Sequence, residues 1–394
     1  MKHFFFLFFL LCIKLSAQQS PVFLSGFSKG GFYTDDGGFG TLSLFDANGN
    51  DLHTLPLSHQ TAGLEANYPE LVEAPNGKVY GLHSAGGNEN VGILFEYDPA
   101  THAYEVIYEF TTDGFVGHSP YGGMILLPSG LLLGTTSTGA SQNKGAIFSF
   151  DPSTHHVQAL AQFSSSSAFE PKGQLLLASN GWVYGTTSGS GVNNLGAVYR
   201  FHPTTYQFQI VHEFSAVIDG TTPTGGLCEV TNGQLVGFCA EGGQYNNGLV
   251  YSLSLSNHSF SSLYSLNSTT TGKPEIGNGP VKLTDGTLIA VLSSGGDNDQ
   301  GCLIFWDLLN AAPNKLYDFD SNSGSNPQGR ICIHSNHSWY WQLNDFNGTT
   351  RLMEYNPLSP SLTVAVDSIA GGGLHGRPLE LSSGELLLLS GTGN

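Results

Sequence analysis

An asparagine or aspartate recurs two residues before a glycine at five places, each in a segment rich in glycine and polar residues. These five residues are Asn90, Asn143, Asn194, Asn246 and Asp299. Such side chains can hydrogen-bond a neutral ligand, for example a glycan, or can instead bond their own backbone and hold the turn. Aromatic residues suited to stacking on a sugar lie in the same segments or beside them: Phe115, Tyr121, Phe169 and Tyr245. We expect these nine residues to form a candidate binding face.

Ionisable residues offer a second candidate set near the expected innermost strands. They are Glu70, Glu170, Lys172, Arg330 and Arg377, which differ in type and show no evident pairing along the chain. A Ser-His-Asp order, a phosphate loop, an HExxH motif and an EF-hand loop are all missing from the sequence. His102, His155, His156 and His202 fall in or beside proline turns, where a solvated histidine is ordinary, and the pair Asp35 and Asp36 is weak evidence for calcium. The sequence therefore assigns no catalytic residue, cofactor or metal ligand.

The elements that must position these residues come from an internal repeat of about 52 residues. A glycine that ends a short apolar strand recurs with steps of 51 to 53 residues, and the last two units replace it: Gly81, Gly134, Gly185, Gly237, Ala290 and Trp341. A proline marker recurs independently, with less regular steps around residue 280: Pro69, Pro120, Pro171, Pro223, Pro280, Pro327 and Pro378. Fixed periods of this length indicate a repeat architecture.

Each unit reads as four strands. A hairpin turn such as Asn76-Gly77, Asn180-Gly181 or Asp285-Gly286 joins the first two strands. A glycine-rich loop leads to a third strand with alternating polarity, and a turn such as Asp98-Pro99 opens the fourth. Four-stranded units of this size bury their faces only by stacking, so we predict an all-β fold, a seven-bladed β-propeller of antiparallel blades. The units start near residues 69, 120, 171, 223, 280 and 327.

Both ends of the propeller domain, residues 18–394, are expected to contribute to the seventh blade. This seam blade takes residues 21–57 and 378–394, of which residues 21–57 supply strands two to four and residues 378–382 supply the first strand. Residues 385–391 also read as a second strand, however, which duplicates Val22 to Gly26. Because the chain then stops where a third strand should follow, we expect it to be a fragment of a longer protein.

The sixth unit departs from the pattern, because Trp339-Tyr340-Trp341 replaces the usual Val-Tyr-Gly. A tryptophan at the marker position needs room in the core or an outlet to the central channel. Local repacking and an aromatic binding patch are the two interpretations.

The repeat consensus resembles the GloVer tandem repeat of exported bacterial proteins. Gly185-Thr186-Thr187 followed by Asn194, Gly196, Val198 and Tyr199 carries the resemblance best, and it extends over residues 22 to 394. The resemblance implies a secreted, propeller-like protein, often anchored at the cell surface, and it brings no established catalytic residues. The kelch repeat is a weaker alternative that implies the same fold.

Composition and the N-terminus bound the compartment and the partners. Residues 1–17 read as a signal peptide, with Lys2 and His3 before the apolar run Phe4 to Ile13, which is too short to span a bilayer. No later segment is apolar enough to be a transmembrane segment. The chain carries a net charge of −18, which argues against nucleic acid as a partner.

Cys228 and Cys239 flank a turn and are predicted as buried thiols or, alternatively, as a disulfide.

The sequence therefore predicts a secreted or cell-surface interaction or adhesion module that recognises a glycan or a protein. An extracellular propeller hydrolase or lyase with its active site at the channel mouth is the alternative. Such an enzyme should bring carboxylates and histidines from different blades to one end of the channel. A passive spacer within a longer surface protein is a third possibility.

Overall fold

The computed structural model describes residues 40–46, 48–57, 70–164, 169–189, 194–215, 219–230, 233–275, 277–310, 312–344, 349–369 and 376–391. The chain divides into two units, Met1–Phe32 and Tyr33–Asn394, and every described residue belongs to the second. The predicted signal peptide and the pair Asp35 and Asp36 lie outside the described residues.

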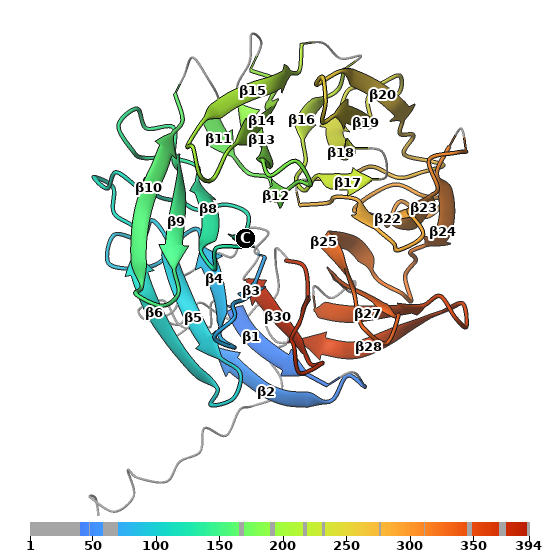
Figure 1. Cartoon of the computed structure of the whole chain (residues 1–394). Helices are drawn as coiled ribbons and strands as arrows, with labels where there is room; N and C mark the ends of the chain where they lie inside the picture. Colours follow the sequence, from blue (N-terminus) through green and yellow to red (C-terminus); the bar gives the residue numbers. More distant parts are fainter. Residues whose placement is uncertain are drawn as a thin grey trace, which may run out of the picture. The chain divides into compact units, whose positions relative to one another are not determined.

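Seven antiparallel sheets follow one another around a ring, and each is one blade of the propeller (Figure 1). Blade 1 consists of β3 (Val72–Glu73), β4 (Val79–His83), β5 (Ile93–Asp98) and β6 (Ala103–Glu109). Blade 2 consists of β7 (Ile125–Leu126), β8 (Leu132–Thr136), β9 (Ala146–Asp151) and β10 (His156–Gln162). Blade 3 consists of β11 (Phe169–Pro171), β12 (Leu176–Leu177), β13 (Val183–Gly189), β14 (Ala197–Phe201) and β15 (Phe208–Glu213). The first strand is innermost and the fourth outermost. In blades 3 and 4 the innermost strand is split into two short segments.

The remaining four blades repeat this plan. Blade 4 consists of β16 (Thr221–Pro223), β17 (Cys228–Val230), β18 (Gln234–Glu241), β19 (Leu249–Ser254) and β20 (Phe260–Ser265), and blade 5 of β21 (Val281–Lys282), β22 (Leu288–Leu292), β23 (Cys302–Trp306) and β24 (Asn314–Asp318). Blade 6 consists of β25 (Ser325–Ile333), β26 (Trp339–Asn344), β27 (Thr350–Asn356) and β28 (Ser361–Ile369). Blade 7 consists of β29 (Leu379–Glu380), β30 (Leu386–Gly391), β1 (Gly40–Phe45) and β2 (Asp51–Pro56). The predicted seven-bladed all-β propeller is confirmed. The described residues contain no helix that could cross a membrane.

Blade 7 closes the ring with strands from both ends of the chain. β1 pairs with β30 over six residue pairs, from Gly40 opposite Gly391 to Phe45 opposite Leu386. Of the two segments expected as the second strand, residues 386–391 therefore occupy that position. The other, Val22 to Gly26, lies outside the described residues.

The core consists of seven apolar clusters, one between each pair of neighbouring blades. Side chains alternate between the two faces of a strand, so one strand contributes to two clusters. On β9, Phe148 and Phe150 pack toward blade 1, while Ile147 packs toward blade 3. Both faces of each blade are thus covered.

The marker glycine makes room for an aromatic ring on the third strand. Gly134 pairs with Phe148 and Gly185 pairs with Tyr199, and a Cβ atom added at either glycine would lie 2.5–2.6 Å from a ring carbon of its partner. Blade 5 solves the same problem differently, because Ala290 there faces Ile304. A larger residue on the second strand therefore goes with a smaller partner on the third.

Blade 6 reverses the arrangement of large and small residues. Trp341 faces Met353 across the strands and is fully buried, and Trp339 is only 6% exposed. The aromatic ring has moved from the third strand to the second, where it contacts Phe319 of blade 5. The interpretation as local repacking is supported, and an exposed aromatic patch at Trp341 is not formed.

The proline marker does not occupy the same place in every blade. Pro120, Pro171, Pro223 and Pro327 each lie five positions before the residue at which the innermost strand begins to pair in its hairpin, namely Ile125, Leu176, Cys228 and Cys332. Pro280 and Pro378 precede it by only one, at Val281 and Leu379. This offset explains why the proline spacing is irregular around residue 280 while the glycine spacing is not.

The four described cysteines are buried free thiols. Cys228 pairs across the strands with Val236 and Cys239 pairs with Pro223, so the two are not partners. Burial raises the pKa of both thiols and keeps them protonated. The alternative of a disulfide between them is not realised.

One buried histidine stands where blades 2 and 3 have threonine. His83 is 1% exposed, its ring lies 5.1 Å from that of Phe95, and neither ring nitrogen has a hydrogen-bond partner among the described residues. Burial lowers the pKa of His83 to about 3, so the ring is neutral in the folded protein.

We predict that Gly185→Ala lowers the free energy of unfolding by about 1–3 kcal/mol, because the added methyl group overlaps the Tyr199 ring. The Gly185→Ala/Tyr199→Ile double variant reproduces the pair found in blade 5 and should lose less than the sum of the single variants. Urea denaturation of all four proteins measures the coupling. Strictly additive losses would contradict the steric explanation.

We predict that His83 makes the fold sensitive to acid. Its folded pKa lies below its unfolded value of 6.5, so the unfolded chain binds an extra proton between about pH 6.5 and 3 and stability falls as the pH is lowered through this window. The slope from this residue approaches about 1 kcal/mol per pH unit. His83→Thr should flatten the unfolding free energy against pH, whereas His156→Thr, at an exposed position, should not. Equal slopes for His83→Thr and wild type would refute this role.

Candidate ligand-binding site

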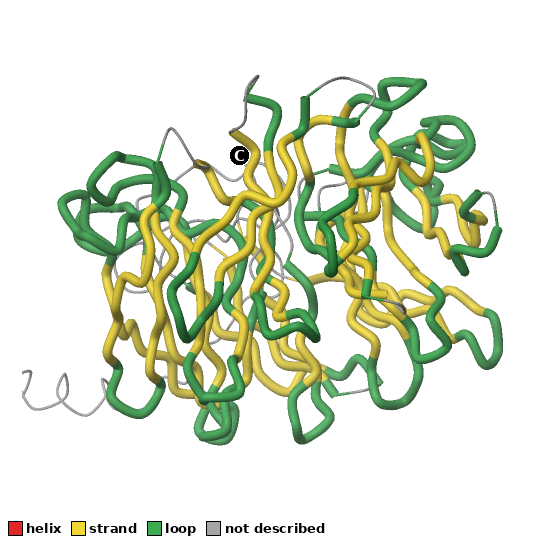
Figure 2. The backbone as a smooth tube through the Cα atoms, turned by 45° about the horizontal axis from the view of Figure 1, so that its top comes forward, coloured by secondary structure: helices red, strands yellow, loops and turns green. Residues whose placement is uncertain are grey.

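Two ends of the ring can be distinguished by their turns (Figure 2). The backbone N–H of Ser119 donates to Val91 O at 2.7 Å, and that of Thr222 donates to Leu195 O at 3.0 Å. These bonds tie the connection into a blade to the loop between the second and third strands of the preceding blade. We call this side the loop end, and the side of the Asn-Gly turns the hairpin end.

The five loop residues Asn90, Asn143, Asn194, Asn246 and Asp299 share a left-handed backbone, with φ between 53° and 61°. Asparagine and aspartate tolerate this conformation better than other non-glycine residues. In four of the five, Oδ1 also accepts the backbone N–H four residues earlier, at 2.9–3.1 Å: from Gly86, Gly139, Gly242 and Gly295. The corresponding part of the Asn194 loop lies outside the described residues. The interpretation as turn-holding residues accounts for this geometry.

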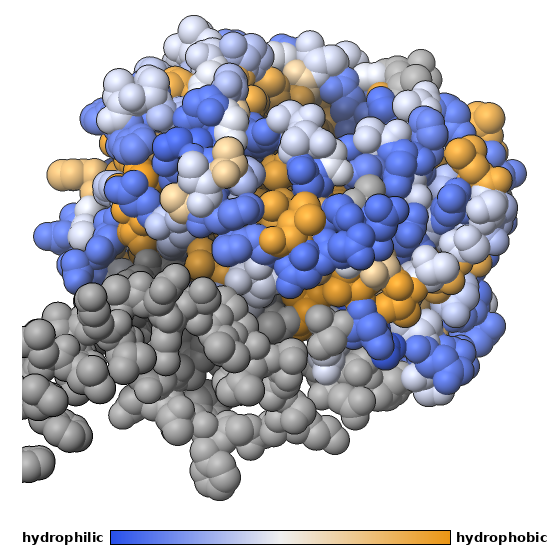
Figure 3. Space-filling view, turned by 90° about the horizontal axis from the view of Figure 1, so that it is seen from below, coloured by the Kyte–Doolittle hydropathy of each residue, from blue (hydrophilic) through white to orange (hydrophobic). Residues whose placement is uncertain are grey.

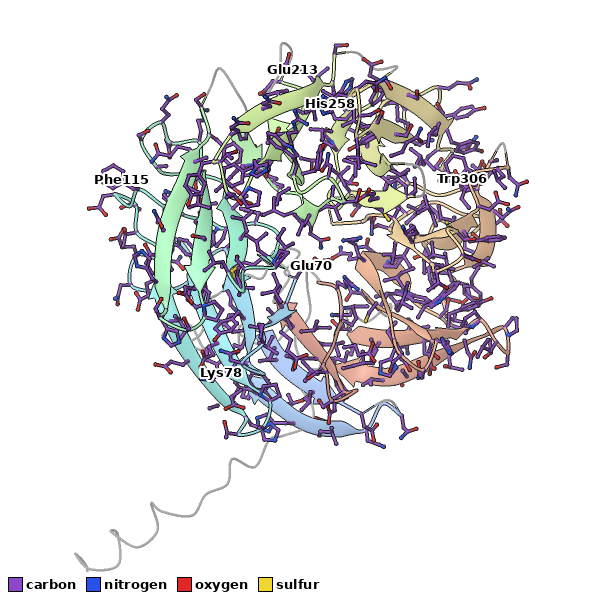
Figure 4. All side chains as sticks on the ribbon, viewed as in Figure 1. Glu70, Lys78, Phe115, Glu213, His258 and Trp306 are labelled. Atoms are coloured by element: carbon purple, nitrogen blue, oxygen red, sulfur yellow. The ribbon has the colours of Figure 1, made fainter. Side chains whose placement is uncertain are left out.

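The four candidate aromatic residues do not form one patch. Phe115 is 77% exposed and lies at the outer edge of the ring (Figure 4). Tyr245 is 49% exposed in the loop of blade 4, and the side chain of Phe169, the first residue of β11, is outside the described set. Only Tyr121 directly follows a marker proline, in the segment before β7, and the Lys172 ammonium lies 5.9 Å from its ring centre.

One repeat position meets at the axis. It lies two residues before the residue at which each innermost strand begins to pair in its hairpin, and it is occupied by Glu70, Gly123, Gln174, Gly226, Gly279, Arg330 and Arg377. Glu70 bridges the backbone of Arg377, and a Cβ atom at Gly123 would overlap Glu70. Figure 4 shows Glu70 close to the middle of the ring. We call these seven residues the axial ring.

Arg330 connects four blades across the axial ring. Its Nη1 donates to Gln174 Oε1 at 2.8 Å and lies 3.5 Å from Glu70 Oε1, and its Nη2 donates to Pro280 O at 3.1 Å. The glycines make space for this side chain, because a Cβ atom at Gly226 would lie 3.0 Å from Arg330 Cδ. The side chains of Arg330 and Glu70 are 13% and 12% exposed, so solvent reaches them only slightly.

Positive charge dominates the axial ring. Burial lowers the pKa of Arg330, Glu70 opposes this shift and nearby Arg377 adds to it, but a guanidinium stays protonated throughout the physiological range. The Nε atoms of Arg330 and Arg377 are buried and have no hydrogen-bond acceptor among the described residues. Two guanidinium groups therefore face one carboxylate, inside a chain whose net charge is −18.

Lys172 and Glu170 lie on the adjoining part of blade 3. The Lys172 ammonium lies 3.6 Å from Glu170 Oε2, and the two side chains are 30% and 46% exposed. Gly122 and Gly173 show that blades 2 and 3 touch here, because a Cβ atom at Gly122 would lie 3.1 Å from Gly173 O. Tyr121 and Lys172 thus stand in the segments that lead into β7 and β12, two residues before the axial ring.

From the sequence, five charged residues were expected near the innermost strands, with no evident pairing among them. The structure pairs Glu70 with Arg330 and Glu170 with Lys172. Gln174, the other partner of Arg330, was missed. The available signal was that Glu70, Gln174, Arg330 and Arg377 share one repeat position at which three blades keep glycine.

A hollow of about 540 Å³ lies at the hairpin end of blades 6, 7 and 1. Its two carboxylates already have partners, because Glu73 accepts from Ser382 N–H at 2.7 Å and Glu380 accepts from Ser335 N–H at 3.0 Å. These bonds join the hairpin of one blade to the innermost strand of the next. Among the described residues no group of three or more histidine, cysteine, aspartate or glutamate side chains is arranged to hold a metal ion.

Similar propellers occur among solved structures at low sequence identity. The extracellular domain of a putative one-component system from B. thetaiotaomicron matches with a TM-score of 0.55 at 11% identity, over 84% of this chain and 39% of that one. This chain thus spans well under half of that protein. A putative 6-phosphogluconolactonase from Bacteroides uniformis and a periplasmic gluconolactonase from Pseudomonas aeruginosa each match with a TM-score of 0.53 at 14% identity. Each covers 84% of this chain, which in turn covers 95% and 97% of theirs.

At such identities these likenesses concern the fold alone, and no curated protein matches the chain. The family model of the Gloeobacter/Verrucomicrobia repeat matches residues 69–279, which is more than half of the sequence. The match spans blades 1 to 4 and the connection into blade 5. The chain therefore belongs to the Gloeobacter/Verrucomicrobia repeat family.

Proposed function

We propose that this protein is an exported recognition module that binds a glycan or protein ligand without catalysis, at the loop end of the propeller axis. The observation that carries the proposal is the convergence of Glu70, Gln174, Arg330 and Arg377 from four blades on a repeat position that is otherwise glycine. Export is proposed from the signal-like residues 1–17. Ligand sites favour places where polar groups from several elements meet.

Tyr121 supports the location of the site. It directly follows Pro120 in the segment that leads into β7, and the ammonium of Lys172 lies within 6 Å of its ring. An aromatic face beside a cation can stack on a sugar ring and hydrogen-bond its substituents. Phe115 and Tyr245, in separate loops, are not part of the proposed site.

Four of the five loop residues, Asn90, Asn143, Asn246 and Asp299, are also left out of the proposed site. Four of the five side-chain oxygens accept hydrogen bonds within their own loops, so a ligand would have to compete for them. The exposed side chains of these residues can contact a large ligand at its edge.

A hydrolase or lyase acting at the same axial position is the second candidate, favoured by the Glu70 carboxylate beside Arg330. Glycoside hydrolysis commonly uses two carboxylates, and the axial ring contains one. The likeness to gluconolactonases extends to the fold only.

We predict that Tyr121→Ala weakens ligand capture at least tenfold, a loss of about 1.4 kcal/mol, because it removes the stacking surface at the axis. A glycan array and a pull-down from extracellular extracts identify the ligand, and titration calorimetry then measures Kd. Tyr245→Ala is the matched control and should bind as wild type does. Asn143→Ala should lower the melting temperature and leave Kd unchanged. Normal binding by Tyr121→Ala would place the site elsewhere.

We also predict no turnover of polysaccharide or lactone substrates above background by the purified domain. Glu70→Gln removes the carboxylate charge and provides the decisive variant for this assay. Turnover by wild type that disappears in Glu70→Gln would show that the protein is an enzyme and not a recognition module.

A further inference from the structure

We propose that the axial site takes a carboxylate, and that its ligand is a short glycan ending in a single uronic acid residue. This inference rests on the proposed function and names the ligand class of the same site. Arg377 is the residue that engages the carboxylate, while Arg330 forms the fixed wall beside it.

The two arginines differ in how far their donors are already used. Arg330 donates to Gln174 and Pro280 O and faces Glu70, so its guanidinium is held by three blades. Arg377 makes no hydrogen bond or ion pair with its side chain among the described residues, and its Nε is buried. A buried guanidinium nitrogen without an acceptor is unfavourable, and a ligand oxygen would relieve this.

The position of Arg377 next to Glu70 is fixed by the backbone. Residues 70 and 377 form a parallel bridge between blades 1 and 7, so the two side chains start from adjacent points of the axial ring. Arg330 is close enough for the charge of Arg377 to act on it. The excess at the axis is thus one positive charge, which a single carboxylate neutralises.

Charge and shape together select the ligand class. A carboxylate can accept two parallel hydrogen bonds from a guanidinium, a geometry that a neutral hydroxyl does not match. The net charge of −18 repels long polyanions, so one acidic residue at the end of a short glycan fits better than a polyuronate. Tyr121 and Lys172, two residues before the axial ring on blades 2 and 3, would contact the sugar ring itself.

The test is titration calorimetry of the full chain with glucuronic acid, its methyl ester and glucose, at low and physiological salt. We expect glucuronate to bind at least tenfold more tightly than the ester or glucose. Arg377→Gln should remove this preference, and its melting temperature should equal or exceed that of wild type. Arg377→Lys keeps the charge but loses the paired donors, so it should bind with intermediate affinity.

Arg200→Gln is the matched control, because Arg200 lies on β14, stacked 4.0 Å over Trp182, and should not change glucuronate binding. Arg330→Gln should instead lower the melting temperature, since it unties Gln174 and Pro280. A peptide with a free carboxyl terminus is a further arm, and its tighter binding would show that the carboxylate comes from a protein.

Four results would overturn the inference: no glucuronate binding by wild type, equal binding of the methyl ester, normal binding by Arg377→Gln, or tighter binding of the peptide than of glucuronate. If wild type instead captures neutral glycans in a manner that depends on Tyr121, the carboxylate inference fails and the proposed recognition function stands. If no ligand depends on either Tyr121 or Arg377, both fail.

Discussion

Burial of both faces of every blade is the constraint on which this structure depends. Each four-stranded sheet carries apolar side chains on both sides, and a stack that closes into a ring leaves no end sheet exposed. The closing step is the pairing of β1 with β30, which brings the two ends of the chain into blade 7. The clusters that flank this blade, with Leu42 and Leu387 on one side and Tyr340 and Leu388 on the other, depend on that pairing. The coloured part of the face shown in Figure 3 is largely hydrophilic, with apolar patches between polar areas.

Ring closure also determines where chemistry can occur. Seven equivalent positions reach the axis together, and the space there is so limited that three of them are glycine. The remaining positions carry Glu70, Gln174, Arg330 and Arg377, which gather polar groups separated by up to 307 residues in the sequence. The repeat brings seven equivalent positions into a narrow space at the axis. The charged residues found there are departures from the glycine of the repeat. This division explains why a chain with few charged residues still has a concentrated positive centre.

The sequence predicted the fold well because the repeat signals are local. The spacing from Gly81 to Trp341 and the Asn-Gly hairpins depend on contacts within one blade, such as the packing of Tyr199 against Gly185. The site was predicted less well, since it depends on alignment between blades. Pro280 and Pro378 stand four residues away from the position that Pro120, Pro171, Pro223 and Pro327 share, which concealed the shared position of Arg330 and Arg377. The role of Asn143 stayed open for another reason, because the same residue type suits a left-handed turn and a ligand contact.

A charged axis calls for an explanation beyond stability. A buried ion pair seldom stabilises a fold more than apolar residues of similar volume, because both groups lose their hydration. Glycine in blades 2, 4 and 5 demonstrates that the axial position folds without any side chain. Arg330 offsets its desolvation through Gln174, Pro280 O and Glu70, and it bridges blades that are not neighbours. Arg377 has no such compensation among the described residues, so its burial weakens the fold unless something outside the axial ring accepts its hydrogen bonds. Stability therefore accounts for Arg330 but not for Arg377. A ligand that accepts hydrogen bonds from Arg377 would gain the most binding free energy at this residue.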